Sequence, residues 1–275
     1  MRKASDITVL PRFMGEEGEK YFTLQFSCPQ QPKAHIVFVP PFGEEMNRCR
    51  ALVSEQARRF ARSGYACTII DLYGTGDSQG ELRDASLQIW QRNIHLTLET
   101  LQREMSVPLI LWGLRLGAFI ALDFAAKSAL AIDSLLLWQP VIAGERYVTQ
   151  ILRQRVASLA SKEGVPETTT EIRKRLAQGE SVEVSGYTIG GALMADIESL
   201  SLAHLTALCP GKIYWLENVS ETGASLATGS LTAIEKLKSL QNDVVAHPFT
   251  GPQVWQLHKR DSLPELISIT SSLLP

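Results

Sequence analysis

The chain has 275 residues and is 45% hydrophobic, so it can bury a large core and fits one large α/β domain with room for an insertion. Its net charge of −2 argues against nucleic acid or an anionic membrane surface as a partner. No N-terminal apolar segment has signal-peptide length, and no run approaches the roughly 20 apolar residues of a membrane span.

The cysteines lie far apart and lack the spacing of a metal site; they are Cys28, Cys49, Cys67 and Cys209. This pattern predicts neither disulfides nor zinc, and it favours a reducing cytoplasm as the location of the protein. We therefore expect no metal and no cofactor.

The N-terminal half predicts strands that alternate with helices. An antiparallel hairpin is expected from ITVLPRF and KYFTLQF, and buried strands are expected from AHIVFVP, YACTIID and VPLILW, because these runs are apolar and rich in β-branched residues. Helices are expected at 47–63, at 115–127 and in a long segment that begins near Asp84 or Ala85, either of which is a suitable cap.

The C-terminal half continues this alternation after an interruption. Residues 132–140 form the next predicted strand. Further strands are expected at 212–217 and 243–249, with a helix near 230–241 between them and a last helix near 262–274. Between them, 143–178 and 191–203 look helical, and 181–189 alternates briefly.

The fold class predicted by this order is α/β: a mostly parallel sheet of eight strands with a helical lid between the sixth and seventh strands. This is the layout of the α/β-hydrolase fold. We expect a core formed by residues 1–140 and 209–275, and a lid insertion formed by residues 141–208.

The segment LILWGLRLGAFIAL has the pattern of the turn that carries the nucleophile in that fold, a strand followed by Gly-x-x-x-Gly and a helix. The central position is Arg115, and a guanidinium stays protonated and cannot attack a carbonyl. Arg115 either lies at an unused site and reaches solvent or an acid, or it binds an anionic ligand. A cation at a helix N-terminus is unfavourable, which slightly favours the second interpretation.

A literal G-x-S-x-G match, GDSQG at 76–80, holds Ser78. Its context differs from that of a nucleophile, because a glycine-rich loop precedes it and the next helix begins several residues later. A nucleophile needs a helix that starts at once, so that N-terminal amides can meet the oxyanion. We interpret Ser78 as a loop serine and keep the nucleophile as the alternative.

The segment VPPFGEEMNRCR occupies the place of an oxyanion-hole loop. The amides of Phe42 or Gly43 and of Leu116 are the candidate donors for an oxyanion. Glu44 and Glu45 follow, and they either favour the first turn of a helix or pair with Arg115 above the sheet. We expect one of the two to make that pair.

A catalytic triad would need an acid after the seventh strand and a histidine after the eighth. Glu217 and Glu221 are the acids in the first region. His247 lies within the last predicted strand, and His258 lies beyond the loop TGPQVWQ, so neither stands cleanly in the expected place for a general base.

Taken together, PPFGEEMNRCR, DLYGTGDSQGEL with Trp90, LILWGLRLGA and LLLWQPV resemble the exosortase A system-associated hydrolase 2 group of the α/β-hydrolase superfamily. The resemblance covers most of the chain. It implies a bacterial protein encoded beside machinery for protein sorting and exopolysaccharide synthesis, and it implies that Arg115 is typical of the group. The chain departs from the group's compact PFW, because it has FTGPQVW there.

Three functions remain possible at this point. The protein binds a small anionic or acyl ligand under the lid through Arg115, with no hydrolysis. Alternatively, it is an ester or thioester hydrolase with an unconventional nucleophile such as Ser78 or an activated water. The third possibility is a non-catalytic module that binds partner proteins of the export or exopolysaccharide locus.

Overall fold

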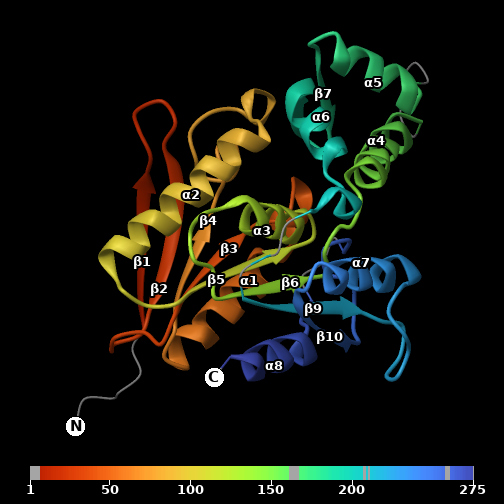
Figure 1. Ribbon diagram of the computed structural model, residues 1–275. Helices are drawn as coiled ribbons and strands as arrows, with labels where there is room; N and C mark the ends of the chain where they lie inside the picture. Colours follow the sequence, from red (N-terminus) through yellow and green to blue (C-terminus); the bar gives the residue numbers. More distant parts are fainter. Residues whose placement is uncertain (1–6, 161–166, 207–208, 210, 258–260, 275) are drawn as a thin grey trace.

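The computed structural model describes residues 7–160, 167–206, 209, 211–257 and 261–274, and it contains an eight-stranded sheet (Figure 1). The strands lie in the order β1-β2-β4-β3-β5-β6-β9-β10, and all neighbours from β4 to β10 are parallel. Strand β2 pairs antiparallel with both of its neighbours, β1 and β4. The strands are β1 Thr8–Met14, β2 Tyr21–Ser27, β3 His35–Val39, β4 Ala66–Ile70, β5 Leu109–Leu114, β6 Ser134–Trp138, β9 Lys212–Asn218 and β10 Asp243–Phe249. This is the predicted α/β-hydrolase architecture.

Helices cover both faces of the sheet (Figure 1). One hydrophobic core joins the sheet to α2, α3 and α7, and a second core joins it to α1 and α8. The second core contains contacting aromatic rings, with Trp112 between Phe38 and Trp138. The helices are α1 Glu44–Arg62, α2 Leu87–Glu104, α3 Leu116–Lys127, α7 Thr228–Ser239 and α8 Pro264–Leu273, with a short 3-10 helix η1 at Leu82–Asp84.

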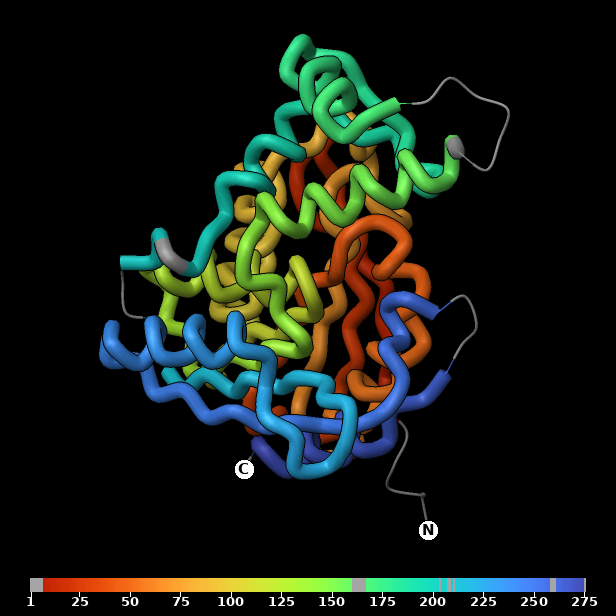
Figure 2. The backbone as a smooth tube through the Cα atoms, turned by 90° about the vertical axis from the view of Figure 1, so that its right-hand side faces the viewer, coloured from red at the N-terminus to blue at the C-terminus, as the bar shows by residue number. Residues whose placement is uncertain are grey.

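Between β6 and β9 the chain leaves the sheet and forms a group of elements that we call the insertion. Figure 2 shows these elements gathered at one end of the molecule. They are α4 Gly144–Ala160, α5 Thr169–Ala177, β7 Ser181–Val184, β8 Tyr187–Gly190, α6 Gly191–Ser199 and η2 Leu202–His204. The strands β7 and β8 form a hairpin of their own.

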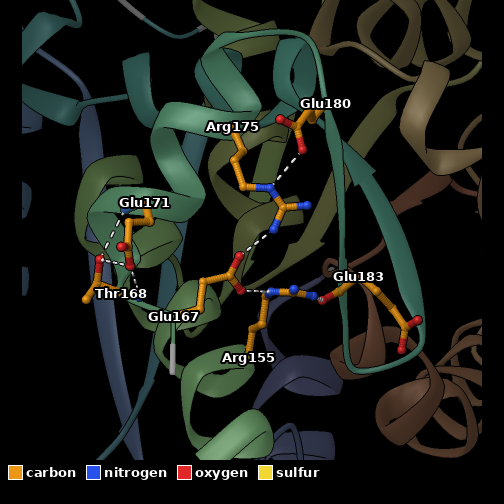
Figure 3. A network of polar contacts seen from close by, with 7 residues as sticks. All are labelled: Arg155, Glu167, Thr168, Glu171, Arg175, Glu180 and Glu183. Carbon is orange, nitrogen blue, oxygen red and sulfur yellow. Dashed lines mark hydrogen bonds and ion pairs between the residues drawn. The ribbon is translucent and has the colours of Figure 1, made fainter. Parts of the chain in front are cut away.

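Ion pairs hold the parts of the insertion together (Figure 3). Glu167 lies between two guanidinium groups: Arg155 of α4 donates to it at 2.7 Å, and Arg175 of α5 pairs with its other oxygen. Arg155 also donates to the backbone carbonyl of Glu183 on β7 at 2.5 Å. One guanidinium therefore fixes the distance between α4 and the hairpin.

The insertion is also anchored to the core. Asp196 of α6 accepts a hydrogen bond of 2.9 Å from the amide of Leu87, the first residue of α2. Gly190 packs against η1 so closely that an added Cβ would lie 2.0 Å from the carbonyl oxygen of Arg83. Contacts of this kind on backbone atoms leave little freedom for the insertion to move as a body.

The element order is confirmed, and several boundaries differ from the predicted ones. Helix α1 begins at Glu44, three residues before the predicted start, because the chain turns into the helix directly at Gly43. The cap of α2 is Ser86, whose side chain accepts from the amide of Ile89 at 3.2 Å, and neither Asp84 nor Ala85 has that role. The predicted lid boundary near residue 208 lies outside the described residues. Within the described ranges, no helix combines the length and apolarity that crossing a membrane requires.

We expect Gly117→Ala to lower the free energy of unfolding by several kcal/mol, because its Cβ would lie 2.2 Å from the carbonyl oxygen of Val39 and 2.3 Å from that of Pro40. Denaturant unfolding monitored by circular dichroism measures this change. Gly229→Ala is the matched control, because its Cβ meets only the flexible end of Ile142. An equal loss of stability in both variants would contradict the packing argument.

Candidate functional site

The turn between β5 and α3 holds Arg115 in an unusual backbone conformation. Its φ of 56° and ψ of −119° lie in a region that side chains rarely adopt, as expected from the sequence for a nucleophile-type turn. The amide of Arg115 donates to Trp138 at 2.9 Å, and its carbonyl accepts from Val141 at 3.2 Å. The C-terminal end of β6 and the segment just after it therefore hold this residue in place.

Two glycines make the turn possible. A Cβ on Gly113 would lie 2.4 Å from Cα of Ala118, so only glycine lets α3 cross β5 this closely. Gly117, described above, lets the loop after β3 pack on the first turn of α3. This contact brings Phe42 and Gly43 to the same end of the sheet as Leu116, the first residue of α3.

The side chain of Arg115 is paired with an acid, as the sequence predicts for one of two glutamates. The acid is Glu45: Nε of Arg115 donates to its Oε1 at 3.1 Å. The other oxygen of Glu45 accepts from the hydroxyl of Tyr147 at 2.9 Å. Glu44 instead lies near Arg48, at 3.7 Å, and accepts from Asn47. Thus α1, α3 and α4 each contribute one member of a connected group.

Two aromatic rings also contact the Arg115 guanidinium. Its Cζ lies 5.8 Å from the ring centroid of Tyr147 and 5.6 Å from that of Trp255, distances typical of cation–π contacts. Trp255 comes from the loop after β10, and Arg48 holds that loop by donating to the carbonyls of Trp255 and Gln256 at 3.4 and 3.0 Å. A tryptophan therefore lies where the fold's catalytic histidine would be expected.

A cavity of about 270 Å³ adjoins this group. Its walls come from the start of α1, from α4, from the β7–β8 hairpin and from the loop after β10. The lining residues are Phe42, Gly43, Glu44, Glu45, Arg48, Tyr147, Gln150, Ile151, Gln154, Val184, Ser185, Tyr187, Ile189, Trp255 and Gln256. Three of them, Glu45, Tyr147 and Trp255, contact Arg115, so the guanidinium lies immediately behind the cavity wall.

Burial sets the ionisation of the neighbouring groups. Burial, together with the negative charge of Glu45, raises the pKa of Tyr147 well above its ordinary value, so the phenol stays protonated and remains a donor to Glu45. Burial also raises the pKa of Cys49 to about 12. The Cys49 thiol is therefore not ionised at neutral pH, which is unsuitable for a nucleophile.

Ser78 lies elsewhere, in the loop after β4. Its hydroxyl donates to the carbonyl of Asp71 at 2.5 Å and accepts from the amide of Phe22 at 2.8 Å. Asp71 in turn pairs with Arg50 at 2.9 Å and accepts from the amide of Asp77. These bonds attach the glycine-rich loop to β2 and β4, and they give Ser78 a structural task.

The other candidate triad residues are also apart from Arg115. His247 lies within β10, which two strands separate from β5, so roughly 14 Å of sheet lies between them. Burial and the charge of Lys212 lower the pKa of His247. Glu217 is buried and accepts from the indole of Trp215 and the amide of Ala227. Glu221 is exposed, and His258 lies outside the described residues.

The sequence did not single out Tyr147. It lies at the start of a helix whose apolar positions predict burial, and nothing in a helical period distinguishes a buried phenol from a core residue. Hydrogen-bond requirements give one indication. A half-buried Glu45 that pairs with a single arginine has a second carboxylate oxygen, and that oxygen needs another donor. That reasoning requires a donor but does not locate it in the chain.

Comparison with known proteins places this chain in a family of hydrolases. The family described as serine aminopeptidase, S33 matches residues 30–185. A mitochondrial palmitoyl-protein thioesterase, ABHD10 of Pongo abelii, is 30% identical over 102 residues, which span 37% of this chain but only 31% of that protein.

Solved structures agree on the fold. Est1E of Butyrivibrio proteoclasticus with ferulic acid bound is similar over 95% of this chain and 97% of its own, with a TM-score of 0.66 and 15% identity. Mouse alpha/beta hydrolase domain-containing protein 10 is similar over 98% and 96%, with a TM-score of 0.56 and 15% identity. At these identities the likeness concerns the fold alone.

We expect Tyr147→Phe to lower the free energy of unfolding by about 1–3 kcal/mol, because Oε2 of Glu45 loses its donor in a partly buried setting. Tyr73→Phe is the control, since no hydrogen bond of the Tyr73 hydroxyl is recorded within the described part of the chain. Chemical unfolding of both variants and the parent measures the difference. The hydrogen bond would be unimportant if the two variants were equally stable.

Proposed function

The chain belongs to the serine aminopeptidase S33 family, and we propose that it uses this fold to bind a small anionic or acyl ligand rather than to hydrolyse one. The ligand would occupy the cavity under the insertion, which would act as the lid of the site. Residues 1–140 and 209–275 would form the core, and residues 141–208 would form the lid.

One observation carries this proposal: a paired arginine stands in the nucleophile's turn, with the backbone conformation of that turn preserved. Strain of this kind costs about 1–3 kcal/mol and persists where the surroundings enforce it. The recorded hydrogen bonds of the guanidinium in the described residues go through Nε to Glu45. Its two terminal nitrogens would bind the ligand's carboxylate, a group that guanidinium groups bind well.

Supporting arguments come from the groups around Arg115. A guanidinium cannot act as a nucleophile, and Trp255 lies over it in place of a general base. The amides of Phe42 or Gly43 and of Leu116 would bind the ligand's oxygen, as oxyanion donors do in active relatives. Glu45 would orient Arg115, and His247 and Ser78 would have no part in binding.

The biological setting is a further part of the proposal. The motif resemblance to the exosortase A system-associated group suggests a bacterial protein of an export or exopolysaccharide locus, with partner proteins encoded there. The similarity to a palmitoyl-protein thioesterase suggests that the ligand carries an acyl or carboxylate group. The cysteines are all unpaired, which fits the cytoplasm.

We expect a simple carboxylate, hexanoate, to raise the melting temperature of the protein, and neutral hexanamide to have a smaller effect. Arg115→Gln should weaken hexanoate binding by about tenfold to a hundredfold, because a charged hydrogen bond is lost. Calorimetric titration measures both. Arg48→Gln is the comparison variant at the rim; if only this variant loses binding, Arg115 is not the anion site.

We expect weak or no turnover of p-nitrophenyl acetate and no labelling by a fluorophosphonate probe. Arg115→Ser should not create an esterase. Trp255 lies over the side chain at position 115, and two strands separate β5 from β10, the strand that holds His247. Release of nitrophenolate measures activity. Robust turnover in the parent that Ser78→Ala abolishes would make Ser78 the true nucleophile and overturn this proposal.

A further inference from the structure

The lining of the cavity limits which ligand it can take. We propose that it selects a short carboxylate that carries hydroxyl or amide groups, and that it rejects a long fatty acyl chain. This inference rests on the proposed binding function and adds the chemical class of the ligand to it.

Size is the first argument. The cavity volume of about 270 Å³ is below the roughly 300–1,000 Å³ that is usual for ligand pockets. The apolar residues Ile151, Val184 and Ile189 line the cavity, and they are themselves buried and belong to the hydrophobic core. A long alkyl chain would therefore have to displace packed side chains to find space.

The walls are also tied to one another. Arg155 connects α4 to the hairpin through the carbonyl of Glu183, as Figure 3 shows. On the other side, Asn47 of α1 donates to the hydroxyl of Tyr187 at 2.6 Å, which connects the hairpin to the core. Each bond joins two of the elements that supply cavity walls, so moving these elements apart to widen the cavity would break a polar contact.

Polarity is the second argument, and it comes from the face of α4. Tyr147 and Ile151, four residues apart, are buried in the cavity, and Gln150 and Gln154 lie on the same face at its rim. No hydrogen bond is recorded for either glutamine side chain within the described ranges. Each amide offers donors and an acceptor without charge, a combination suited to hydroxyl or amide groups.

The third argument is the charge of the groups at and behind the cavity wall. Glu45 accepts from Arg115 and from Tyr147, and its charge offsets that of Arg115. Glu44 lies at the rim and would repel a second carboxylate there, but it can accept a hydrogen bond from a hydroxyl. A ligand with one carboxylate at the Arg115 end and neutral polar groups at the rim matches this arrangement.

Three carboxylates of defined size test the proposal by calorimetric titration: gluconate, hexanoate and dodecanoate below its micelle concentration. Gluconate and hexanoate have the same chain length and differ in their hydroxyl groups. We expect gluconate to bind about tenfold more tightly than hexanoate, since two or more neutral hydrogen bonds are added, and dodecanoate not to bind. Tightest binding by dodecanoate would overturn the inference.

The double substitution Gln150→Leu and Gln154→Leu tests the specificity residues. Both side chains are exposed, so the fold should remain intact, and the preference for gluconate over hexanoate should fall about threefold to tenfold. Arg153→Leu is the control, because Arg153 is exposed on the same helix but does not line the cavity. An unchanged preference in the double variant would contradict the assignment.

The same titrations separate this inference from the proposed function. If no carboxylate binds, or if Arg115→Gln leaves all binding unchanged, the proposed anion site fails and the inference fails with it. If binding depends on Arg115 but hexanoate or dodecanoate is preferred to gluconate, the anion site stands and the ligand class alone is overturned.

Discussion

The pair between Arg115 and Glu45 is the constraint on which the arrangement of this end of the molecule depends. A cation at the N-terminus of α3 opposes the helix dipole, so it needs a nearby negative charge. Glu45 supplies that charge from the first turn of α1, where the dipole favours it. Glu45 then needs a second donor, and Tyr147 supplies it from α4. The need to neutralise Arg115 therefore links α1 and the start of α3 to α4 of the insertion.

The sequence was sufficient for the fold because the fold depends on local patterns. Buried strands such as LILWGL and the glycines at 113 and 117 are readable without knowledge of distant contacts. The ion pair was partly predictable, since an acid was required near Arg115 and two adjacent glutamates stood in the facing loop. Adjacent residues of a helix point in different directions, so only one of the two glutamates can reach Arg115. In the structure this is Glu45, and Glu44 lies near Arg48 instead.

Tyr147 and Trp255 could not be predicted, because their positions depend on how distant segments pack. Trp255 belongs to a loop whose course is set by Arg48 and by Asn218, which donates to the carbonyl of Gly251 at 3.0 Å. Neither bond follows from any sequence period. Ser78 shows the opposite case: its motif matched a catalytic signature, but its hydroxyl is engaged with Asp71 and Phe22. A motif therefore needs its structural context before it indicates chemistry.

The strained backbone of Arg115 raises the question of what holds the turn in this conformation. An exchange to arginine alone would leave a buried charge beside the sheet, which is more costly than the strain itself. The fold resolves this by surrounding the guanidinium with Glu45, Tyr147 and Trp255. The site therefore presents a fixed cation behind a small polar cavity, and the proposed recognition of an anionic ligand rests on this arrangement.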